Sequence, residues 1–305
     1  MNMESAPSGI LLIRKPPSFT SHDIVNVIRK QYNTRQVGHT GTLDPMAEGL
    51  LVVLVGRAVK ASDYAVGHDK TYRAELLLGL TTDTEDVTGA VLSRADRLPS
   101  EDEVRNVLPA FVGEIRQTPP MYSAIKQNGE PLYKLARRGV TVEREPRTVA
   151  IRSLTCEPIA PAEGRYALTV VCSKGTYIRT LCADIGRALG YGGVMAALTR
   201  TAVGPFSLAD AVAPEALKDM TDAEREARLL PVERLFTEND ALTMPAFYAH
   251  LAASGCEIYL KKLGVSYPVG TRLRLYDEKN EFFAFGEVRE YESGPAVKSL
   301  VLFRI

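Results

Sequence analysis

The hydrophobic and polar positions of this 305-residue chain follow strand-like and helix-like periods in turn, without the regular strand–helix–strand rhythm of a doubly wound sheet. Four runs of strand length are apolar, alternating or rich in β-branched residues, and they predict strands at Ile10–Ile13, Leu50–Val55, Tyr72–Leu80 and Tyr166–Cys172. Helical spacing predicts helices from Thr20 or Ser21 through Ile28, from the Ser100/Glu103 capping box through Leu108, and over Thr176–Leu189 before the stop residue Gly190. This mixture predicts an α+β fold.

The pattern changes in the last quarter of the chain. Residues Pro214–Asp240 hold eight acidic residues against four basic ones, with little strand character, and we interpret them as a partly helical connection. Three short β-rich runs follow, separated by turn residues: Tyr267–Tyr276, Phe282–Tyr291 and Lys298–Phe303. We therefore predict a larger domain over residues 1–238 and a small β-rich domain over residues 239–305.

Composition narrows the class of protein. The chain is 45% hydrophobic and 24% charged, which excludes general disorder, a coiled coil and a collagen-like fibre. No run of 18 apolar residues occurs, and the opening MNMESAPSG lacks the basic and apolar regions of a signal peptide. We therefore expect no membrane association and a cytoplasmic location.

The cysteines do not form a metal or disulfide pattern. The chain has no C-x-x-C pair, and its four cysteines share no spacing with its four histidines. Reduced and mostly buried thiols are expected at Cys156, Cys172, Cys182 and Cys256.

The densest chemical motif is GHTGTLDPMAEGLL, residues Gly38–Leu51. It reads as a turn-rich loop that carries polar side chains, including His39 and Asp44, and runs into an apolar strand. A polar loop held by a rigid scaffold is typical of a catalytic site. An Asp before Pro is also a common turn residue whose carboxylate bonds nearby amides, so the motif alone supports either interpretation.

This run resembles the G-H-x-G-T-L-D-P signature of the TruB family of tRNA pseudouridine synthases. Five further segments resemble other blocks of that family in the same order: Arg14–Val25, Lys70–Gly89, Gln117–Gly139, Cys172–Gly186 and Leu198–Phe206. Ser18 stands where the family usually has Gly, and Thr199 replaces an Arg. The resemblance covers most of residues 10–206. It implies a pseudouridine-synthase-like α+β fold, with a mixed, largely antiparallel sheet and flanking helices. The less specific tail only resembles the small PUA-like RNA-binding domain that closes many members.

The activity that the resemblance implies is isomerisation of uridine to pseudouridine at position 55 in the T loop of tRNA. The N1–C1′ bond breaks and the base rejoins through C5, so no redox change occurs and no cofactor is expected. Asp44 matches the family nucleophile, Arg179 the arginine that pairs with it, and Tyr72 the active-site tyrosine. A nearby guanidinium favours the ionised carboxylate that covalent catalysis needs. Attack at C1′, attack at C6 and a glycal route all stay open.

Further substrate contacts follow from the same resemblance. His39 matches a histidine that inserts into the T loop when the target base is extruded, and Leu198 matches an apolar residue at the edge of the uracil pocket. Lys126 and Tyr177 lie within matched segments and are predicted to contact the substrate. Each has an ordinary alternative, such as a hydrogen-bonded loop histidine or a core leucine.

Charge is segregated although the formal net charge is zero. Residues 126–152 hold seven basic residues against three acidic ones, a net charge of +4. Phosphate contact that weakens with salt is expected from this segment. The resemblance marks about residues 119–147 as an insertion that grips the T stem-loop, and Lys134, Arg137 and Arg138 are its predicted RNA contacts. The chain is expected to act as a monomer.

Three alternatives were weighed against this enzyme. The chain could be an RNA-binding folding helper with dispensable catalysis, but Asp44, Tyr72 and Arg179 occur together, which favours the enzyme. It could be a guide-dependent relative that acts on other RNA, but such relatives usually carry long basic tails, and this chain ends at Ile305 without one. An unrelated hydrolase is disfavoured because no G-x-S-x-G, P-loop or H-E-x-x-H pattern occurs.

Overall fold

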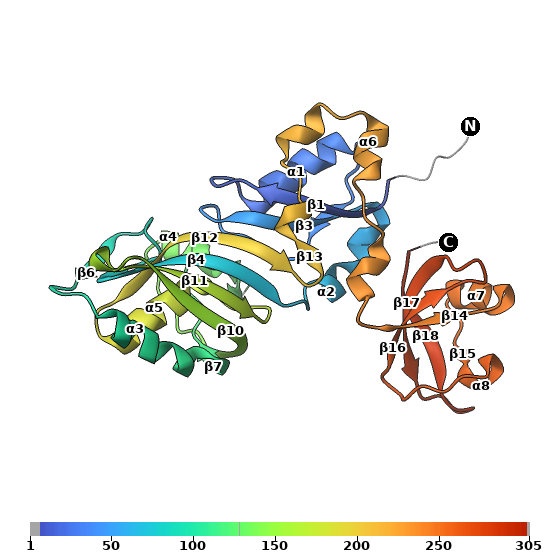
Figure 1. Cartoon of the computed structure of the whole chain (residues 1–305). Coiled ribbons are helices and arrows are strands. Elements are labelled where there is room, and N and C mark those ends of the chain that lie inside the picture. The colour runs from blue at the N-terminus through green and yellow to red at the C-terminus, as the bar shows by residue number, and fades with distance from the viewer. Residues whose placement is uncertain (1–6, 128, 304–305) are drawn as a thin grey trace.

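The structure is a computed structural model that describes residues 7–127 and 129–303. Within these residues, a nine-stranded sheet with helices on its faces is followed by a smaller five-stranded, β-rich part (Figure 1). The α+β class and the β-rich C-terminal part predicted from the sequence are therefore confirmed. Residues 1–6, on which the expectation of no signal peptide mainly rests, and Ile305 lie outside the described residues.

The large sheet has the strand order β1-β3-β12-β4-β11-β10-β7. These strands are β1 (Gly9–Lys15), β3 (Glu48–Val55), β12 (Gly193–Val203), β4 (Lys70–Leu78), β11 (Arg165–Cys172), β10 (Arg147–Ala160) and β7 (Gly113–Gln117). Short strands β2 (Val37–His39) and β13 (Phe206–Ser207) pair with β3 and β12. The pairings are antiparallel except that of β12 with β3, which is parallel and short. The sheet is therefore mixed and largely antiparallel, as expected.

Side-chain burial explains why the sequence of β3 is apolar almost throughout, whereas apolar and polar residues alternate in part along β4. Every residue of β3 after Glu48 is buried, because alternate side chains enter two different apolar clusters. In β4 the buried residues alternate with more exposed ones, so this strand has one core face. That face packs against α5 (Ile178–Leu189) and α3 (Glu101–Val107), which lie together below the sheet in Figure 1.

The helix ends follow the local sequence. Thr20 and Ser100 each cap a helix through a capping box, for α1 (Ser21–Gln31) and α3 respectively. Gly190 ends α5 with a φ of +82°, a left-handed conformation that favours glycine. α5 begins at Ile178 rather than at Thr176, because Tyr177 before it has extended backbone angles.

Some predicted bounds were wrong. The run predicted as one strand to Leu80 is divided at Gly79, whose φ of +86° breaks the extended backbone. Leu80 instead opens β5 (Leu80–Thr82), which pairs with β6 (Val91–Arg94). The strands β7, β10 and β12 were not predicted at all.

The remaining elements of the larger part are short. They are α2 (Ser62–Ala65), β8 (Lys126–Gln127), β9 (Glu130–Pro131), α4 (Leu132–Arg137), α6 (Asp222–Ala227) and the 3₁₀ helices η1 (Gly56–Ala61), η2 (Leu108–Phe111), η3 (Pro161–Glu163), η4 (Leu208–Asp210), η5 (Glu215–Lys218) and η6 (Val232–Phe236). The acidic segment 214–240 is thus a partly helical connection, as interpreted from its sequence. No helix among the described residues has the length and apolar character needed to span a bilayer.

The C-terminal sheet has the order β14-β16-β17-β18-β15. It consists of β14 (Asp240–Thr243), β15 (Ile258–Tyr259), β16 (Arg272–Tyr276), β17 (Phe282–Arg289) and β18 (Ala296–Leu302), with helices α7 (Ala246–Ala253) and α8 (Leu260–Leu263). The run predicted as a strand from Tyr267 is a strand only from Arg272 onward.

An aromatic cluster joins the two parts of the molecule. Phe236 of η6 stacks on Phe285 of β17, with ring centroids 4.1 Å apart, and Tyr64 of α2 meets Phe285 edge-on at 5.2 Å. The buried apolar cluster that contains these rings also includes residues of β1 and β3. The division between residues 238 and 239 stays a prediction, since this cluster packs across it.

Candidate active site

Asp44 and Arg179, far apart in the sequence, form an ion pair. Nε of Arg179 lies 2.8 Å from Oδ2 of Asp44. Asp44 comes from the loop between β2 and β3, and Arg179 from the first turn of α5. The arginine side chain is 5% exposed, whereas the aspartate side chain is 36% exposed. The carboxylate is therefore open to a ligand while its partner is shielded from water.

The other donors of Arg179 are also held. Its Nη1 donates to the carbonyl of Thr84 at 3.2 Å, and its Nη2 donates to the carbonyl of Tyr122 at 2.9 Å. Nη1 lies 3.8 Å from Oδ2 of Asp86, a buried carboxylate whose Oδ1 accepts a hydrogen bond from the Thr84 hydroxyl. These partners fix the orientation in which the guanidinium presents Nε.

The backbone on either side of Asp44 is fixed by buried polar groups. The Ser21 hydroxyl accepts a hydrogen bond from the N–H of Leu43 at 2.9 Å. The ammonium of Lys15 donates to the carbonyl of Pro45 at 3.4 Å. Lys15 is fully buried, and this burial lowers its pKa to about 8, although nearby Asp44 opposes the shift. The loop is therefore tied to β1 and α1 around the exposed carboxylate.

A second buried arginine reaches this loop from β12. Arg200 is 1% exposed and donates to the backbone carbonyls of Gly41, Thr42 and Leu50. These acceptors lie before and after Asp44 in the chain. Arg200 thus bonds the main chain of the loop, whereas Arg179 bonds the carboxylate.

Tyr72 and Leu198 belong to the apolar cluster next to the loop. Their exposed fractions are 9% and 7%, and both pack in one cluster with Leu43, which precedes Asp44. Burial raises the pKa of Tyr72, against the opposing charge of Arg200, so its hydroxyl stays protonated at neutral pH. The site thus combines an open carboxylate with an apolar floor and a neutral phenol.

His39 is half-buried at the end of β2. Its Nδ1 accepts a hydrogen bond from the N–H of Gly41 at 3.3 Å. Burial lowers the pKa of His39, and the positive charge of Arg200 lowers it further. The imidazole is therefore neutral at neutral pH.

Tyr177 lies immediately before α5, close enough to Asp44 and Arg179 for their charges to act on its hydroxyl. The side-chain amide of Gln117 accepts a hydrogen bond from the backbone N–H of Tyr177, at 3.1 Å, and donates one to the backbone carbonyl of Tyr177, at 3.3 Å. Gln117 is buried at the end of β7, where the predicted insertion begins. The insertion and the start of α5 are therefore joined next to the ion pair.

The predicted RNA contacts of the insertion are all exposed: Lys126 on β8, Lys134 and Arg137 on α4, and Arg138 after it. The guanidinium of Arg137 lies over the ring of Tyr133, 5.6 Å from its centroid. Arg138 forms an ion pair with Glu130 at 2.7 Å. These cations lie at the molecular surface and are not part of the apolar floor. The carboxylate of Glu130 partly compensates the charge of Arg138.

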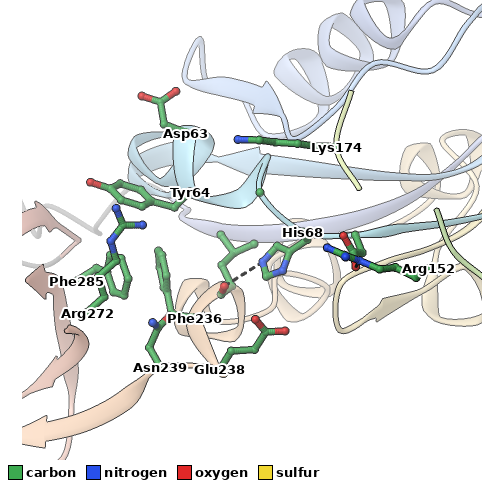
Figure 2. A pocket seen from close by; sticks show the side chains of 13 residues that line it. Asp63, Tyr64, His68, Arg152, Lys174, Phe236, Glu238, Asn239, Arg272 and Phe285 are labelled. Carbon is green, nitrogen blue, oxygen red and sulfur yellow. Dashed lines mark hydrogen bonds and ion pairs between the residues drawn. The ribbon is translucent and has the colours of Figure 1, made fainter. Parts of the chain in front are cut away.

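A cleft of about 550 Å³ lies elsewhere, between the larger part and the C-terminal part (Figure 2). Its lining includes three cations and three carboxylates: Arg152, Lys174 and Arg272, with Asp63, Asp69 and Glu238. Arg152 pairs with Asp69 at 3.1 Å, and His68 bonds the carbonyl of Leu235 at 3.0 Å. This balanced lining does not select a phosphate, and it includes neither Asp44 nor Arg179.

The sequence analysis did not single out Asp86, Lys15 or Arg200. Charged side chains are expected at the surface, and no periodicity indicates that these three are buried. Their position in the sequence could have indicated a role, since each of the three lies within a segment that resembles a family block. Gln117 opens another such segment.

Two family models match consecutive parts of the chain. The model described as TruB family pseudouridylate synthase (N terminal domain) matches residues 29–178. The model described as tRNA pseudouridylate synthase B C-terminal domain matches residues 179–237. Asp44 and Tyr72 lie in the first match, and Arg179 opens the second.

Curated relatives resemble the chain over most of its length. It is 45% identical to the tRNA pseudouridine synthase B of Alkaliphilus oremlandii (strain OhILAs), over 92% of this chain and 93% of that protein. It is 43% identical to the tRNA pseudouridine synthase B of Burkholderia mallei (strain NCTC 10247), over 93% and 94% respectively.

Solved structures share the fold at low identity. One is a chain of the "Structure of H/ACA RNP bound to a substrate RNA containing 2'-deoxyuridine", with 22% identity and a TM-score of 0.72 over 98% of this chain and 86% of that one. Another is a chain of a Cbf5-Nop10-Gar1 complex, with 24% identity and a TM-score of 0.70 over 98% and 85%.

Proposed function

Because the chain belongs to the TruB family of pseudouridylate synthases, we propose that it converts the uridine at position 55 in the T loop of tRNA, with Asp44 as nucleophile. The enzyme is an isomerase, a tRNA pseudouridine synthase of the TruB type. The observation that carries the proposed mechanism is the ion pair between the exposed Asp44 carboxylate and the buried Arg179.

Asp44 supplies the nucleophilic oxygen. A carboxylate attacks only when it is ionised and held in place, and the Arg179 guanidinium serves both needs through its Nε. Cleavage of the N1–C1′ bond frees the base, which turns and rejoins the ribose through C5. The C5 proton is lost, N1 gains a proton and the covalent bond to Asp44 breaks, so the product is an isomer of uridine. The contacts of Asp44 are compatible with attack at either C1′ or C6.

The extruded uracil stacks against the apolar floor. Tyr72 and Leu198 keep water from its face, and stacking on an aromatic ring contributes about 1–3 kcal/mol per base. The protonated hydroxyl of Tyr72 is a donor for the base. Extrusion itself costs a few kcal/mol, which this stacking offsets in part.

The remaining predicted contacts bind the RNA around the base. His39 is a neutral ring at the end of β2, where the Asp44 loop begins, and is suited to occupying the space that the uridine leaves in the T loop. Lys126, Lys134, Arg137 and Arg138 contact the phosphates of the T stem-loop, and Tyr177 lines the entrance to the site. All groups of this mechanism belong to one chain, so we propose that a monomer acts, in the cytoplasm where tRNA is modified. The likeness to the H/ACA proteins concerns the fold and does not favour guide-dependent action.

Position-specific mapping tests the substrate. Purified enzyme is incubated with an unmodified tRNA transcript, and pseudouridine is mapped along the RNA. Conversion is expected at position 55 and is expected to vanish in a matched transcript with cytidine there. Conversion that persists at another uridine, with none at position 55, would contradict the proposed substrate.

Asp44→Asn tests the nucleophile. The amide keeps the shape of the side chain but cannot form the covalent bond, so single-turnover rate is expected to fall about 10⁴-fold or more. Affinity for a T-arm stem-loop, measured by fluorescence anisotropy, should change little. Turnover by this variant, with deamidation to Asp excluded by mass spectrometry, would contradict the assignment.

Chelation tests the proposal that no cofactor takes part. A short T-arm stem-loop avoids the magnesium that full-length tRNA needs to fold, and its uridine should be converted at the same rate in EDTA. Dependence on one restored metal, with stem-loop binding unchanged, would show that the mechanism lacks a component.

A further inference from the structure

Arg200 lies where three strands meet beside the Asp44 loop. In the sheet register it stands opposite Gly49 of β3 on one side and Tyr72 of β4 on the other. The backbone of Gly49 has a φ of +108°, and a Cβ placed there would lie 2.4 Å from the carbonyl oxygen of Arg200. The close approach of β3 to β12 at this point therefore requires glycine.

The side chain of Arg200 bonds backbone atoms on both arms of the loop. Nη2 lies 3.0 Å from the carbonyl oxygen of Gly41, Nη1 lies 3.3 Å from that of Thr42, and Nε lies 2.8 Å from that of Leu50. The first two acceptors precede Asp44 and the third follows it. One planar guanidinium thus sets the spacing between the two arms.

Burying the Arg200 guanidinium and the carbonyls of the loop costs free energy unless each group has a hydrogen-bond partner. Arg200 is 1% exposed. Its side chain donates to three backbone carbonyls and also forms a hydrogen bond with the Tyr72 side chain, and none of these partners is a carboxylate. A buried cation is tolerated when dipoles surround it, and a buried carbonyl needs a donor. The arginine and the loop therefore fix each other.

We propose that Arg200 is a positioning residue of the isomerisation: it holds the main chain on both sides of Asp44, so that the carboxylate meets the target base at the required distance. This inference rests on the proposed role of Asp44. Arg179 orients the carboxylate directly, whereas Arg200 bonds the main chain of the loop and the side chain of Tyr72. The two arginines thus fix the nucleophile by different atoms.

Arg200→Lys tests the role, because the variant keeps the charge but replaces three nitrogens by one. Misplacement of a reacting group by about 1 Å can cost about 100-fold in rate, and a single-turnover rate lowered to that extent is expected. Affinity for the T-arm stem-loop should stay within about threefold, since Arg200 is buried. A loss of affinity with an unchanged rate would overturn the proposal.

Arg225→Lys is the matched control. The Arg225 side chain, 14% exposed, also donates to backbone carbonyls, those of Leu217 and Met220, but it lies in α6. Both variants are assayed well below their thermal unfolding midpoints. The control is expected to retain the wild-type rate; an equal loss in both variants would mean that Arg200 matters only for stability.

The double variant Arg179→Lys, Arg200→Lys tests whether both arginines act on the rate by placing Asp44 or whether their effects on the rate are independent. If both arginines act by placing Asp44, the double variant loses less rate than the product of the two single losses. A full product would overturn the proposal. Asp44→Asn, measured alongside, distinguishes this failure from that of the proposed function, because an active Asp44→Asn would contradict the nucleophile itself.

A second route does not depend on replacing Arg200. Incorporating lactic acid at position 42 turns the Gly41 carbonyl into an ester, a weaker acceptor for Nη2, and Thr42→Ala is its matched amide control. The ester is expected to react about 3–10-fold more slowly than the alanine variant, as expected for weakening one charge-assisted hydrogen bond. Equal rates would show that this carbonyl contact does not position Asp44.

Discussion

Arg179 uses a different nitrogen for each of its close partners: Nε for Asp44, Nη1 for the Thr84 carbonyl and Nη2 for the Tyr122 carbonyl. A lysine cannot reach all three. We expect Arg179→Lys to lower the single-turnover rate about 100-fold, with T-arm affinity within about threefold of wild type. Rapid-quench assays and anisotropy titrations measure the two quantities.

Arg187→Lys controls for the same change in the same helix. The Arg187 side chain is 72% exposed and pairs with Asp184 three residues earlier, so its replacement should leave the rate unchanged. A wild-type rate for Arg179→Lys at saturating RNA would show that the pair with Asp44 is dispensable.

The neutral state of His39 gives a pH prediction. Its pKa lies below the ordinary value of 6.5, so the cation forms only at more acidic pH. If protonated His39 contributes to RNA binding, its contribution would raise the affinity only as pH falls below 6.5. It would not change the affinity between pH 6.5 and about 8.5. Wild type and His39→Gln are expected to show parallel affinity–pH curves in that upper range. A wild-type affinity that rises as pH falls within it, and does not rise in the variant, would mean that His39 binds as a cation.

At the residue scale, the family blocks predicted the ion pair of the candidate site better than the supports around it. The Asp44–Arg179 pair was expected from the matched segments and is present. Of the supports that were missed, Lys15 and Arg200 donate to backbone carbonyls, which leave no trace in the side-chain pattern, and Asp86 faces Arg179 across a long separation in the sequence. Ser18 is instructive: it replaces a usual glycine, and its φ of +69° lies in the left-handed region where glycine is favoured.

The basic insertion gives a prediction at the scale of an element. Lys134 and Arg137 are exposed on α4, and neither is paired with a carboxylate among the ion pairs of the described residues. Replacing both by Gln should weaken T-arm binding and reduce the slope of log affinity against log salt by about 1.4, since each lost phosphate contact removes about 0.7. Titrations at four salt concentrations measure that slope.

Lys218→Gln with Arg228→Gln removes the same charge from the acidic segment. Both side chains are exposed there, so the double change matches the net charge of the insertion variant. Its slope should equal that of wild type. Equal slopes in all three proteins would locate the phosphate contacts outside α4.

Elements with strong local signals were predicted well. The capping boxes of α1 and α3 and the stop glycine of α5 are encoded within a few residues, and the structure contains each of them. β10 and β12 were missed because their patterns are irregular. Register irregularities interrupt the pairing of both strands, so neither shows a strict alternation. The apolar run Val194–Leu198 of β12 is short and contains two alanines, which are depleted in strands.

The attachment of the C-terminal part is a property of the whole molecule. Phe236 is 2% exposed and stacks on Phe285, so Phe236→Ala opens a cavity between the two parts. We expect the free energy of unfolding to fall by about 3–5 kcal/mol. Calorimetry should then show two transitions in place of one, because the shared apolar cluster is broken.

Phe247→Ala is the control for loss of an aromatic ring. Phe247 is 67% exposed on α7, so its removal should change stability by less than about 0.5 kcal/mol. A Phe236→Ala protein with wild-type stability would show that the cluster does not hold the C-terminal part in place.

The strand order has a consequence for protein synthesis. β12 lies between β3 and β4, yet it is translated after both of them and after β10 and β11. A nascent chain that has not reached residue 203 therefore lacks part of the strand that joins the two halves of the sheet. One edge of β4 and the Glu48–Gly49 end of β3 then have incomplete strand pairing. Such edges are sites of wrong pairing and aggregation. Until residue 200 has left the ribosome, the Asp44 loop also lacks the Arg200 side chain that bonds its carbonyls. The molecule becomes competent to act on tRNA only late in its own translation.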